Sequence, residues 1–317
     1  MDDLGEILTR LEDVMGPLAG APAELDGGIT NRNLRLALAD GEYVLRRPGA
    51  QTELLGIDRE SERIASEAAA ALGIAPPVAR ALDDCLLTRF VSSRQLTARE
   101  VAVSVREVAL ALRDFHDSAT RLPTRFSVPN LMAEYAKIVY ARGGALPEAF
   151  AKAQATAARI AAALPVGMRR PCHNDLLAAN FIRADASISG SQVHDGQLLI
   201  VDWEYAGMGD PRFDLGNLSV NNEFDDATDE RLLSAYLGRA PGEGERAAHG
   251  LMRVLSDARE GAWGVVQGHL SELEFDFDAY AEERFSRMSQ AVEGPLFERW
   301  IAAVRSDGPG ERDAQAT

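Results

Sequence analysis

Apolar and polar residues alternate along two short stretches near the start of the chain, residues 33–39 and 42–47. A period of two places the apolar side chains on one face of a strand. Asp40-Gly41 separates the stretches, and an Asp-Gly pair in this position is a strong signal for a β-hairpin. The pattern therefore predicts two antiparallel strands joined at residues 40–41.

Helical patterns lie on both sides of this hairpin. Residues 4–15 are expected to form a short helix, and residues 58–72 a second one, with Asp58 as N-cap and Gly73 as the stop. After Pro76-Pro77 two more strands are predicted, and Ser92-Ser93 is expected to be a hinge. These later strands are residues 78–82 and 85–91.

Beyond the hinge the pattern is mainly helical, except for two short strands that flank a Ser/Gly-rich turn. The predicted helices are residues 97–115, 129–141, 148–163 and several from about 212 onward, and the strands are residues 181–183 and 198–201. The pattern predicts an α+β fold with two lobes. Residues 1–91 form a small antiparallel sheet with one helix, residues 92–305 form the larger helical lobe, and residues 306–317 form a disordered tail.

Composition narrows the possible functions. A length of 317 residues fits two lobes, and 46% hydrophobic with 26% charged residues is ordinary for a globular chain. A formal net charge of −16 argues against nucleic-acid binding and is compatible with a cationic substrate. An acidic surface that only maintains solubility is the alternative reading of the same charge.

Cysteine usage and the N-terminus indicate a cytoplasmic protein. Cys85 and Cys172 are too few for a disulfide framework and lack metal-ligand spacing, so we expect reduced core thiols. The start Met1-Asp2-Asp3 has no features of a signal peptide, and no apolar run reaches the ~20 residues of a membrane span. We expect no membrane insertion, and the oligomeric state stays open.

The segment from His173 to Asn180 carries the clearest chemistry. It matches the kinase catalytic-loop pattern H-x-D-x-x-x-x-N. Asp175 would accept or orient the proton of an attacking hydroxyl, Asn180 would offer an oxygen ligand to Mg²⁺, and His173 would hold the loop by hydrogen bonds. A polar turn following Pro171 is the alternative.

A carboxylate at the end of an apolar strand supports the kinase interpretation. Asp202 follows Leu198-Leu-Ile-Val201, and a carboxylate there needs a partner because burying an unpaired charge is costly. Mg²⁺ would be that partner, as for the aspartate of the kinase D-F-G segment. Glu204 is a candidate for a second or water-mediated ligand, and a turn-capping role for Asp202 is the alternative.

The first lobe should then bind ATP. The segment Asp26-Gly27-Gly28-Ile29-Thr30-Asn31 resembles a loop that covers phosphates, with Gly27, Gly28, Thr30 and Asn31 as contacts, although a plain turn explains it equally well. The only lysines, Lys137 and Lys152, lie beyond the hinge. Val44 and Arg46 share one strand face, so Val44 is expected to cover the adenine and Arg46 to reach the phosphates.

The helix of residues 58–72 offers three carboxylates that could pair with Arg46. They are Glu60, Glu62 and Glu67, and we favour Glu62. A solvated helix surface is the alternative for any one of them.

Together these segments resemble the choline/ethanolamine kinase family, within the aminoglycoside-phosphotransferase-like and protein-kinase-like kinases. The matching segments are residues 27–31, 43–46, 173–180, 200–205, 213–217, 263–267 and 275–280. The resemblance implies a bilobal protein-kinase-like fold, ATP and Mg²⁺ as cofactors, and a small cationic alcohol as substrate.

In that family an aromatic box holds a quaternary ammonium group by cation–π attraction. Trp263, Phe275 and Tyr280 match its members, although a core-packing role explains Trp263 equally well. Two positions depart from the family, because Glu260 stands where eukaryotic choline kinases have a further Trp, and Asn221 near where they have a Glu.

Two alternatives to a choline-type kinase stay open at this point. An aminoglycoside or other antibiotic phosphotransferase of the same fold would have an acidic groove without an aromatic box. A nucleotide-binding pseudokinase is disfavoured because Asp175, Asn180 and Asp202 are all present.

Overall fold

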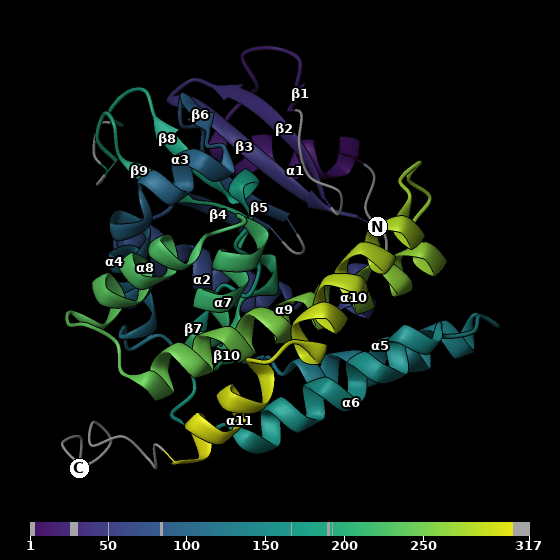
Figure 1. The fold of residues 1–317 in the computed structure, drawn as a ribbon. Coiled ribbons are helices and arrows are strands. Elements are labelled where there is room, and N and C mark those ends of the chain that lie inside the picture. The colour runs from purple at the N-terminus through teal and green to yellow at the C-terminus, as the bar shows by residue number, and fades with distance from the viewer. Residues whose placement is uncertain are drawn as a thin grey trace. The chain divides into compact units, whose positions relative to one another are not determined.

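The computed structural model describes residues 4–25, 31–49, 51–82, 85–165, 167–188, 191 and 193–306. The chain forms two compact units. The first comprises Met1–Thr97 with Ala179–Tyr205, and the second comprises Ala98–Ala178 with Ala206–Thr317. The α+β fold class is confirmed, since the first unit contains an antiparallel sheet and the second is mainly helical (Figure 1).

The sequence division placed residues 179–205 in the helical lobe, whereas their contacts group them with the first unit. The lobe boundary at residue 91 stays a prediction. The predicted tail lies outside the described residues, apart from Ser306, the last residue of helix α11 (Phe297–Ser306).

A five-stranded antiparallel sheet in the order β1-β2-β3-β5-β4 forms the centre of the first unit. The predicted hairpin is confirmed, with Leu38 paired to Gly41 across the turn and Gly41 at a φ of 145°. The strands are β1 (Ala23–Leu25), β2 (Asn31–Leu38), β3 (Gly41–Pro48), β4 (Val78–Leu82) and β5 (Cys85–Arg89).

Helix α1 (Leu4–Met15) covers one face of this sheet. Its Ile7 and Leu11 are buried against apolar side chains of β2 and β3, among them Leu36 and Leu45. Alternation along β3 turns Arg46 away from the face that carries Leu45. The opposite face is therefore the one that can carry charged side chains.

Helix α2 (Arg59–Ala71) begins and ends where the sequence predicts. The Asp58 carboxylate accepts a hydrogen bond from the backbone N–H of Ser61 at 3.0 Å, which satisfies one of the open donors of the first turn. Gly73, two residues after the helix, has a φ of 73°. A η1 turn (Thr52–Leu55) precedes this helix.

A second, three-stranded sheet in the first unit has the order β6-β8-β9. Its strands are β6 (Ser93–Gln95), β8 (Phe181–Ala184) and β9 (Leu198–Ile200). Ser93, part of the expected Ser92-Ser93 hinge, pairs with Ala184 in this sheet, and the hinge stays a prediction. The sequence could not reveal this pairing because the partner strand lies about ninety positions further along the chain.

The second unit is built around the 28-residue helix α9 (Glu243–Leu270). Helices α5, α6, α7, α10 and α11 all contact it (Figure 1). Its side chains are buried around most of its circumference, as expected of a central helix. The contacting helices are α5 (Val128–Ala141), α6 (Glu148–Ala163), α7 (Pro211–Asn221), α10 (Phe277–Glu293) and α11 (Phe297–Ser306).

The predicted helix of residues 97–115 is interrupted in the structure. It consists of α3 (Ala98–Val103) and α4 (Val105–His116), which meet at Ser104. The unit also holds α8 (Asp226–Leu237) and the strand pair β7 (Arg170–Cys172) and β10 (Gly207–Gly209). Across the described part of the chain, no helix has the length and apolar character needed to cross a bilayer.

Candidate active site

Arg46 on β3 is surrounded by carboxylates of the first unit. Its Nε lies 3.2 Å from Oε1 of Glu62, and its Nη2 forms an ion pair with Asp202. Oε2 of Glu204 lies 3.7 Å from the same Nη2. The Arg46–Glu62 pair favoured from the sequence is therefore present, on the strand face that alternation predicted.

The two other candidate glutamates are engaged elsewhere. Glu60 and Glu67 both form ion pairs with Arg63 on the exposed surface of α2. Glu62 differs because its side chain is only 4% exposed, on the side of the helix that faces β3. Val44 is half-buried on β3 and pairs in register with Thr88 of β5.

Arg59 is a second guanidinium in this cluster that sequence reasoning missed. Its Nη1 lies 2.6 Å from Oε2 of Glu62 and 3.6 Å from Oε2 of Glu204. Burial alone would lower the pKa of Arg46, but Asp202, Glu62 and Glu204 together raise it well above its ordinary value. Among the described residues, these ion pairs join three carboxylates to two guanidinium groups, a formal excess of one negative charge.

The predicted metal ligands lie at the end of β9. The backbone N–H of Val201 donates to the carbonyl oxygen of Asn180 at 2.9 Å, which brings the η2 turn (Ala178–Asn180) beside Asp202 in the first unit. Asp202 has a φ of 67°, a left-handed conformation that Asp tolerates better than most residues. Glu204 follows in the η3 turn (Trp203–Tyr205).

This donor set fits a hard divalent cation. Asp202 and Glu204 offer carboxylate oxygens and Asn180 an amide oxygen, the ligand types that Mg²⁺ prefers. The excess negative charge of the buried cluster is an independent reason why a cation would bind there. Asp202 keeps 23% of its side chain exposed, so the side chain is partly accessible to solvent.

His173 and Asp175, the residues of the predicted catalytic loop, belong to the second unit. The backbone N–H of Asp175 donates to Nδ1 of His173 at 3.2 Å, which is the loop-holding contact expected of this histidine. Asn174 between them has a φ of 68°, and Asn is one of the few residue types that tolerate this conformation. The loop therefore places Asp175 by means of one left-handed residue.

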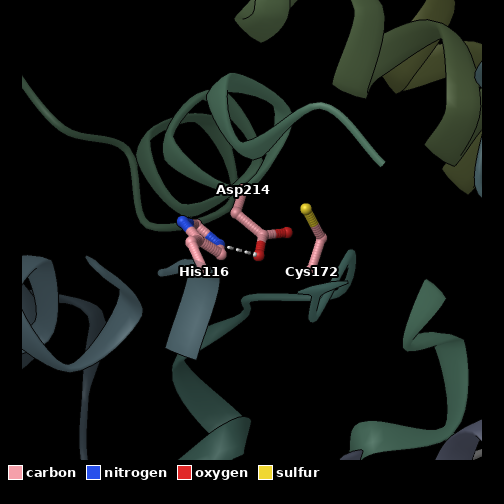
Figure 2. Close-up of side chains that lie close together, drawn as sticks. All are labelled: His116, Cys172 and Asp214. Carbon is pink, nitrogen blue, oxygen red and sulfur yellow. Dashed lines mark hydrogen bonds and ion pairs between the residues drawn. The ribbon is translucent and has the colours of Figure 1, made fainter. Parts of the chain in front are cut away.

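Helix α7 anchors this loop through Asp214. The backbone N–H groups of His173 and Asn174 donate to Oδ2 and Oδ1 of Asp214 at 2.8 and 2.7 Å. Nε2 of His116 lies 2.9 Å from Oδ2 (Figure 2). All of these groups are fully buried, so their hydrogen bonds compensate for the desolvation of the carboxylate.

His116, Cys172 and Asp214 lie close enough to resemble a metal centre (Figure 2). However, the second ring nitrogen of His116 is already 2.9 Å from the hydroxyl of Tyr236. Burial raises the pKa of the Cys172 thiol well above its ordinary value, and the nearby Asp214 raises it further. The thiol is therefore protonated, and the cluster serves to hold the loop.

Two amides of the same region hold the next part of the loop. Oδ1 of Asn217 accepts the backbone N–H of Leu176 at 2.5 Å, and Nδ2 of Asn222 donates to the Leu176 carbonyl at 3.0 Å. The sequence showed Asp214 and Asn217 only as part of a matching segment. Their roles could not be assigned because the partners lie about forty positions earlier in the chain.

Aromatic side chains from α9, α10 and the intervening loop form one cluster. The ring of Trp263 lies 5.8 Å from those of Tyr280 and Phe277, and Phe275 lies 6.0 Å from Tyr280. Trp263 is 8% exposed and Phe275 is 44% exposed. The three residues expected to form the aromatic box are thus brought together, and Phe277 joins them.

Tyr280 makes two polar contacts that the sequence did not indicate. Its hydroxyl donates to Oε2 of Glu260 at 2.8 Å, and the guanidinium of Arg284 lies 4.8 Å from its ring centroid. Arg284 also donates to Oδ1 of Asn221 at 3.4 Å. A cation of the chain itself therefore occupies one face of this ring.

Glu260 is buried and bonded within the protein. Besides Tyr280, its carboxylate accepts a hydrogen bond from Nη1 of Arg259 at 2.6 Å. Burial alone would raise the pKa of Glu260, but Arg259, Arg284 and Tyr280 outweigh it and keep the pKa below its ordinary value. Glu260 is therefore a carboxylate with two donors already in place.

Most of the predicted phosphate-covering loop lies outside the described residues. This applies to Gly27, Gly28 and Thr30, whereas Asn31 begins β2 and only its backbone is described. Their roles stay predictions.

The first unit has an antiparallel sheet and an arginine–glutamate pair between strand and helix, and the helical second unit has a His-x-Asp loop. This combination defines a protein-kinase-like phosphotransferase. A comparison with family models agrees. The chain belongs to the phosphotransferase enzyme family, whose model matches residues 21–251.

Comparisons with individual proteins point in the same direction. The chain is 27% identical over 223 residues to the protein LicA of Haemophilus influenzae, and the match covers 66% of this chain and 61% of that relative's length. A solved choline/ethanolamine kinase family protein of Mesorhizobium loti has a TM-score of 0.77 and 29% identity, covering 95% of this chain and 99% of the other. The choline kinase LicA of Streptococcus pneumoniae, with a TM-score of 0.72, 23% identity and coverage of 91% and 98%, supports the fold.

Proposed function

We propose that this protein is an ATP- and Mg²⁺-dependent kinase that phosphorylates the hydroxyl group of a small amino alcohol such as choline. The acceptor oxygen forms a bond to the γ-phosphorus, the bond from that phosphorus to the bridging oxygen of ADP breaks, and the hydroxyl proton passes to Asp175. The names of the related proteins support the choline-type acceptor.

The charge cluster around Arg46 is the observation that carries the proposal. The ion pair between Arg46 on the strand and Glu62 on the helix would correspond to the lysine–glutamate pair of kinases, which orients the phosphates of ATP. Arg46 also forms an ion pair with Asp202. Asp202, Asn180 and Glu204 would hold Mg²⁺, which neutralises phosphate charge during transfer when it is bound. Arg46 would contact the phosphates through its planar fork of donors.

The acceptor side of the proposal depends on Asp175 and the aromatic cluster. The loop bonds to Asp214 and Asn217 would keep Asp175 in position to receive the proton. Trp263 and Phe275 would contact the apolar part of a substituted ammonium group. Arg284 already lies over Tyr280, which favours Trp263 over Tyr280 as the cation-binding ring.

An ATP-consumption screen tests the function. The purified protein is assayed for ADP release with choline, ethanolamine, related amino alcohols and aminoglycosides, with and without Mg²⁺. We expect turnover with at least one amino alcohol that depends on Mg²⁺. Turnover with aminoglycosides alone would instead identify an antibiotic phosphotransferase, and no turnover with any acceptor would contradict the proposal.

Two variants test the assignment of roles. Asp175→Asn should lower kcat by ~10²–10⁴, the usual contribution of a positioned base, while ATP binding is retained.

Asp202→Ala should abolish Mg²⁺-dependent turnover, because Asn180 alone supplies too little charge. Normal activity of either variant at millimolar Mg²⁺ would remove that residue from its role.

A further inference from the structure

A buried arginine on α9 links the proposed catalytic carboxylate to the aromatic cluster. Nη1 of Arg259 lies 3.2 Å from Oδ1 of Asp175 and 2.6 Å from Oε1 of Glu260. Arg259 is 2% exposed and Asp175 is 14% exposed, measured on their side chains. One guanidinium nitrogen is thus shared by two carboxylates in a place that excludes most water.

The chain of contacts continues beyond Glu260. The carboxylate of Glu260 accepts from Arg259 through Oε1 and from the Tyr280 hydroxyl through Oε2. Burial and the nearby Glu260 raise the pKa of Tyr280, so its hydroxyl keeps the proton that it donates. Tyr280, Glu260, Arg259 and Asp175 therefore form one continuous polar series within the second unit.

We propose that Arg259 is a positioning residue for the acceptor reaction, an inference that rests on the proposed function. It fixes the orientation of the Asp175 carboxylate through Oδ1, while Glu260 and Tyr280 hold Arg259 in place. A carboxylate held at one oxygen can no longer rotate freely about its last bond. Its other oxygen therefore has a defined direction toward the acceptor hydroxyl.

Glu260 has a second effect in this arrangement. The shared nitrogen lies closer to Glu260 than to Asp175, so Glu260 takes the larger part of the electrostatic attraction of the guanidinium. Without Glu260, Arg259 would pair with Asp175 alone, and a tight ion pair is a weaker proton acceptor. Glu260 thus preserves the basicity of Asp175 while Arg259 sets its geometry.

This role differs from that expected of a substrate-binding box. A residue that only contacts the substrate ammonium changes KM for the acceptor, whereas a positioning residue changes kcat. Misplacement of a reacting group by about 1 Å costs on the order of 10²-fold in rate. The Tyr280 hydroxyl belongs to the positioning series by its contact with Glu260, although its ring lies in the aromatic cluster.

The test compares kcat and KM for Arg259→Gln, Arg259→Lys and Tyr280→Phe, measured as choline-dependent ADP release, or ethanolamine-dependent release where that acceptor is better. Arg259→Gln should lower kcat by up to ~10²-fold with KM for ATP changed less than about threefold. Arg259→Lys should recover part of this loss because it keeps a charged donor. Tyr280→Phe, which removes only the hydroxyl, should lower kcat by about threefold to tenfold, the size of one hydrogen bond.

Arg253→Gln is the matched control, since Arg253 is an ion-paired arginine of the same helix whose partner is Asp229. It should leave kcat unchanged. The double variant Asp175→Asn/Arg259→Gln should be no slower than Asp175→Asn alone, because Arg259 acts through Asp175.

Multiplied losses in the double variant, or a rise in acceptor KM at unchanged kcat for Tyr280→Phe, would overturn the positioning role. If Arg259→Gln does not fold, Tyr280→Phe and the control Arg253→Gln still test the positioning role. Failure of the proposed function is recognised separately, because the wild-type protein would then show no turnover with any acceptor.

Discussion

Arg46 is the residue that we propose to fulfil the role for which kinases ordinarily use lysine. The two lysines of the chain form exposed ion pairs in the second unit, Lys137 with Glu134 and Lys152 with Glu148. Arg46 can bind Glu62 through Nε and Asp202 through Nη2, which a single ammonium group could not do with the same geometry. The arginine therefore joins strand, helix and candidate metal ligand in one cluster.

Replacing Arg46 tests this assignment. Arg46→Ala should lower kcat/KM for ATP by roughly tenfold to a hundredfold, the range for hydrogen bonds to charged groups, whereas Arg47→Ala on the opposite strand face should change it much less. Steady-state kinetics with varied ATP measures both. Arg46→Lys keeps a positive charge beside the buried carboxylates, so it is the variant expected to disturb folding least. A larger effect at Arg47 than at Arg46 would show that the strand register was misassigned.

Single residues also mark the limit of what the sequence could reveal. The Asp58 cap and the Arg46–Glu62 pair follow from local rules of alternation and capping, and both are present. Arg259 and Glu260 were not recognised as a buried pair, because adjacent charges on a helix normally lie at its solvated surface. Only the packing of other helices around α9 buries both of them.

At the scale of elements, α7 holds the proposed catalytic loop through hydrogen bonds. Asp214 and Asn217, three positions apart, lie on one side of the helix and accept hydrogen bonds from the backbone N–H groups of three loop residues, His173, Asn174 and Leu176. These bonds go to backbone groups, so they do not depend on the side chains of the loop residues that donate them. The position of Asp175 then depends on how firmly α7 itself is held.

The close approach of α7 and α9 gives a prediction at this scale. A Cβ added at Gly216 would lie 2.6 Å from the backbone carbonyl carbon of Met252 and 2.8 Å from the nitrogen of Arg253. Backbone atoms cannot move aside as a flexible side chain can, so Gly216→Ala should reduce the free energy of unfolding by about 1–3 kcal/mol. Urea denaturation measures the loss.

Gly167→Ala is the control, since no atom lies within 4 Å of its added Cβ, and it should change stability by less than about 0.5 kcal/mol. Equal stability of the two variants would mean that α7 and α9 are not in close contact.

Element prediction from the sequence succeeded where the signal was local. The β2–β3 hairpin, α1, α2, α5 and α6 all lie within a few residues of their predicted bounds. Strands β1, β6, β7 and β10 were missed because each has only three residues and is stabilised by a partner elsewhere in the chain. The break at Ser104 was missed because serine is only mildly unfavourable within a helix.

At the scale of the whole molecule, the net charge of −16 becomes a kinetic property. An acidic protein attracts a cationic acceptor over distances comparable to the Debye length, ~10 Å at 0.1 M salt. If the acceptor is choline or a similar amine, its kcat/KM should fall several-fold between 20 and 300 mM NaCl, at roughly constant kcat.

A neutral alcohol of similar size, where accepted, provides the control because it experiences no such attraction. Stopped-time ADP assays at several salt concentrations measure both. An equal salt dependence for charged and neutral acceptors would contradict electrostatic attraction of the substrate, and would leave solubility as the role of the acidic surface.

Residues 179–205 belong to the first unit, but the ribosome synthesises them after residues 98–178 of the second unit. The first unit therefore cannot be completed until part of the second unit has been made. The core between α1 and the five-stranded sheet uses only residues before Thr97, so it can form early in synthesis. Arg46 and Asp202, however, are separated by 156 positions. At ~5–20 residues per second, roughly 8–30 s pass between their syntheses. For part of that interval β6 lacks its partner strand β8, so the nascent chain has an unpaired strand edge.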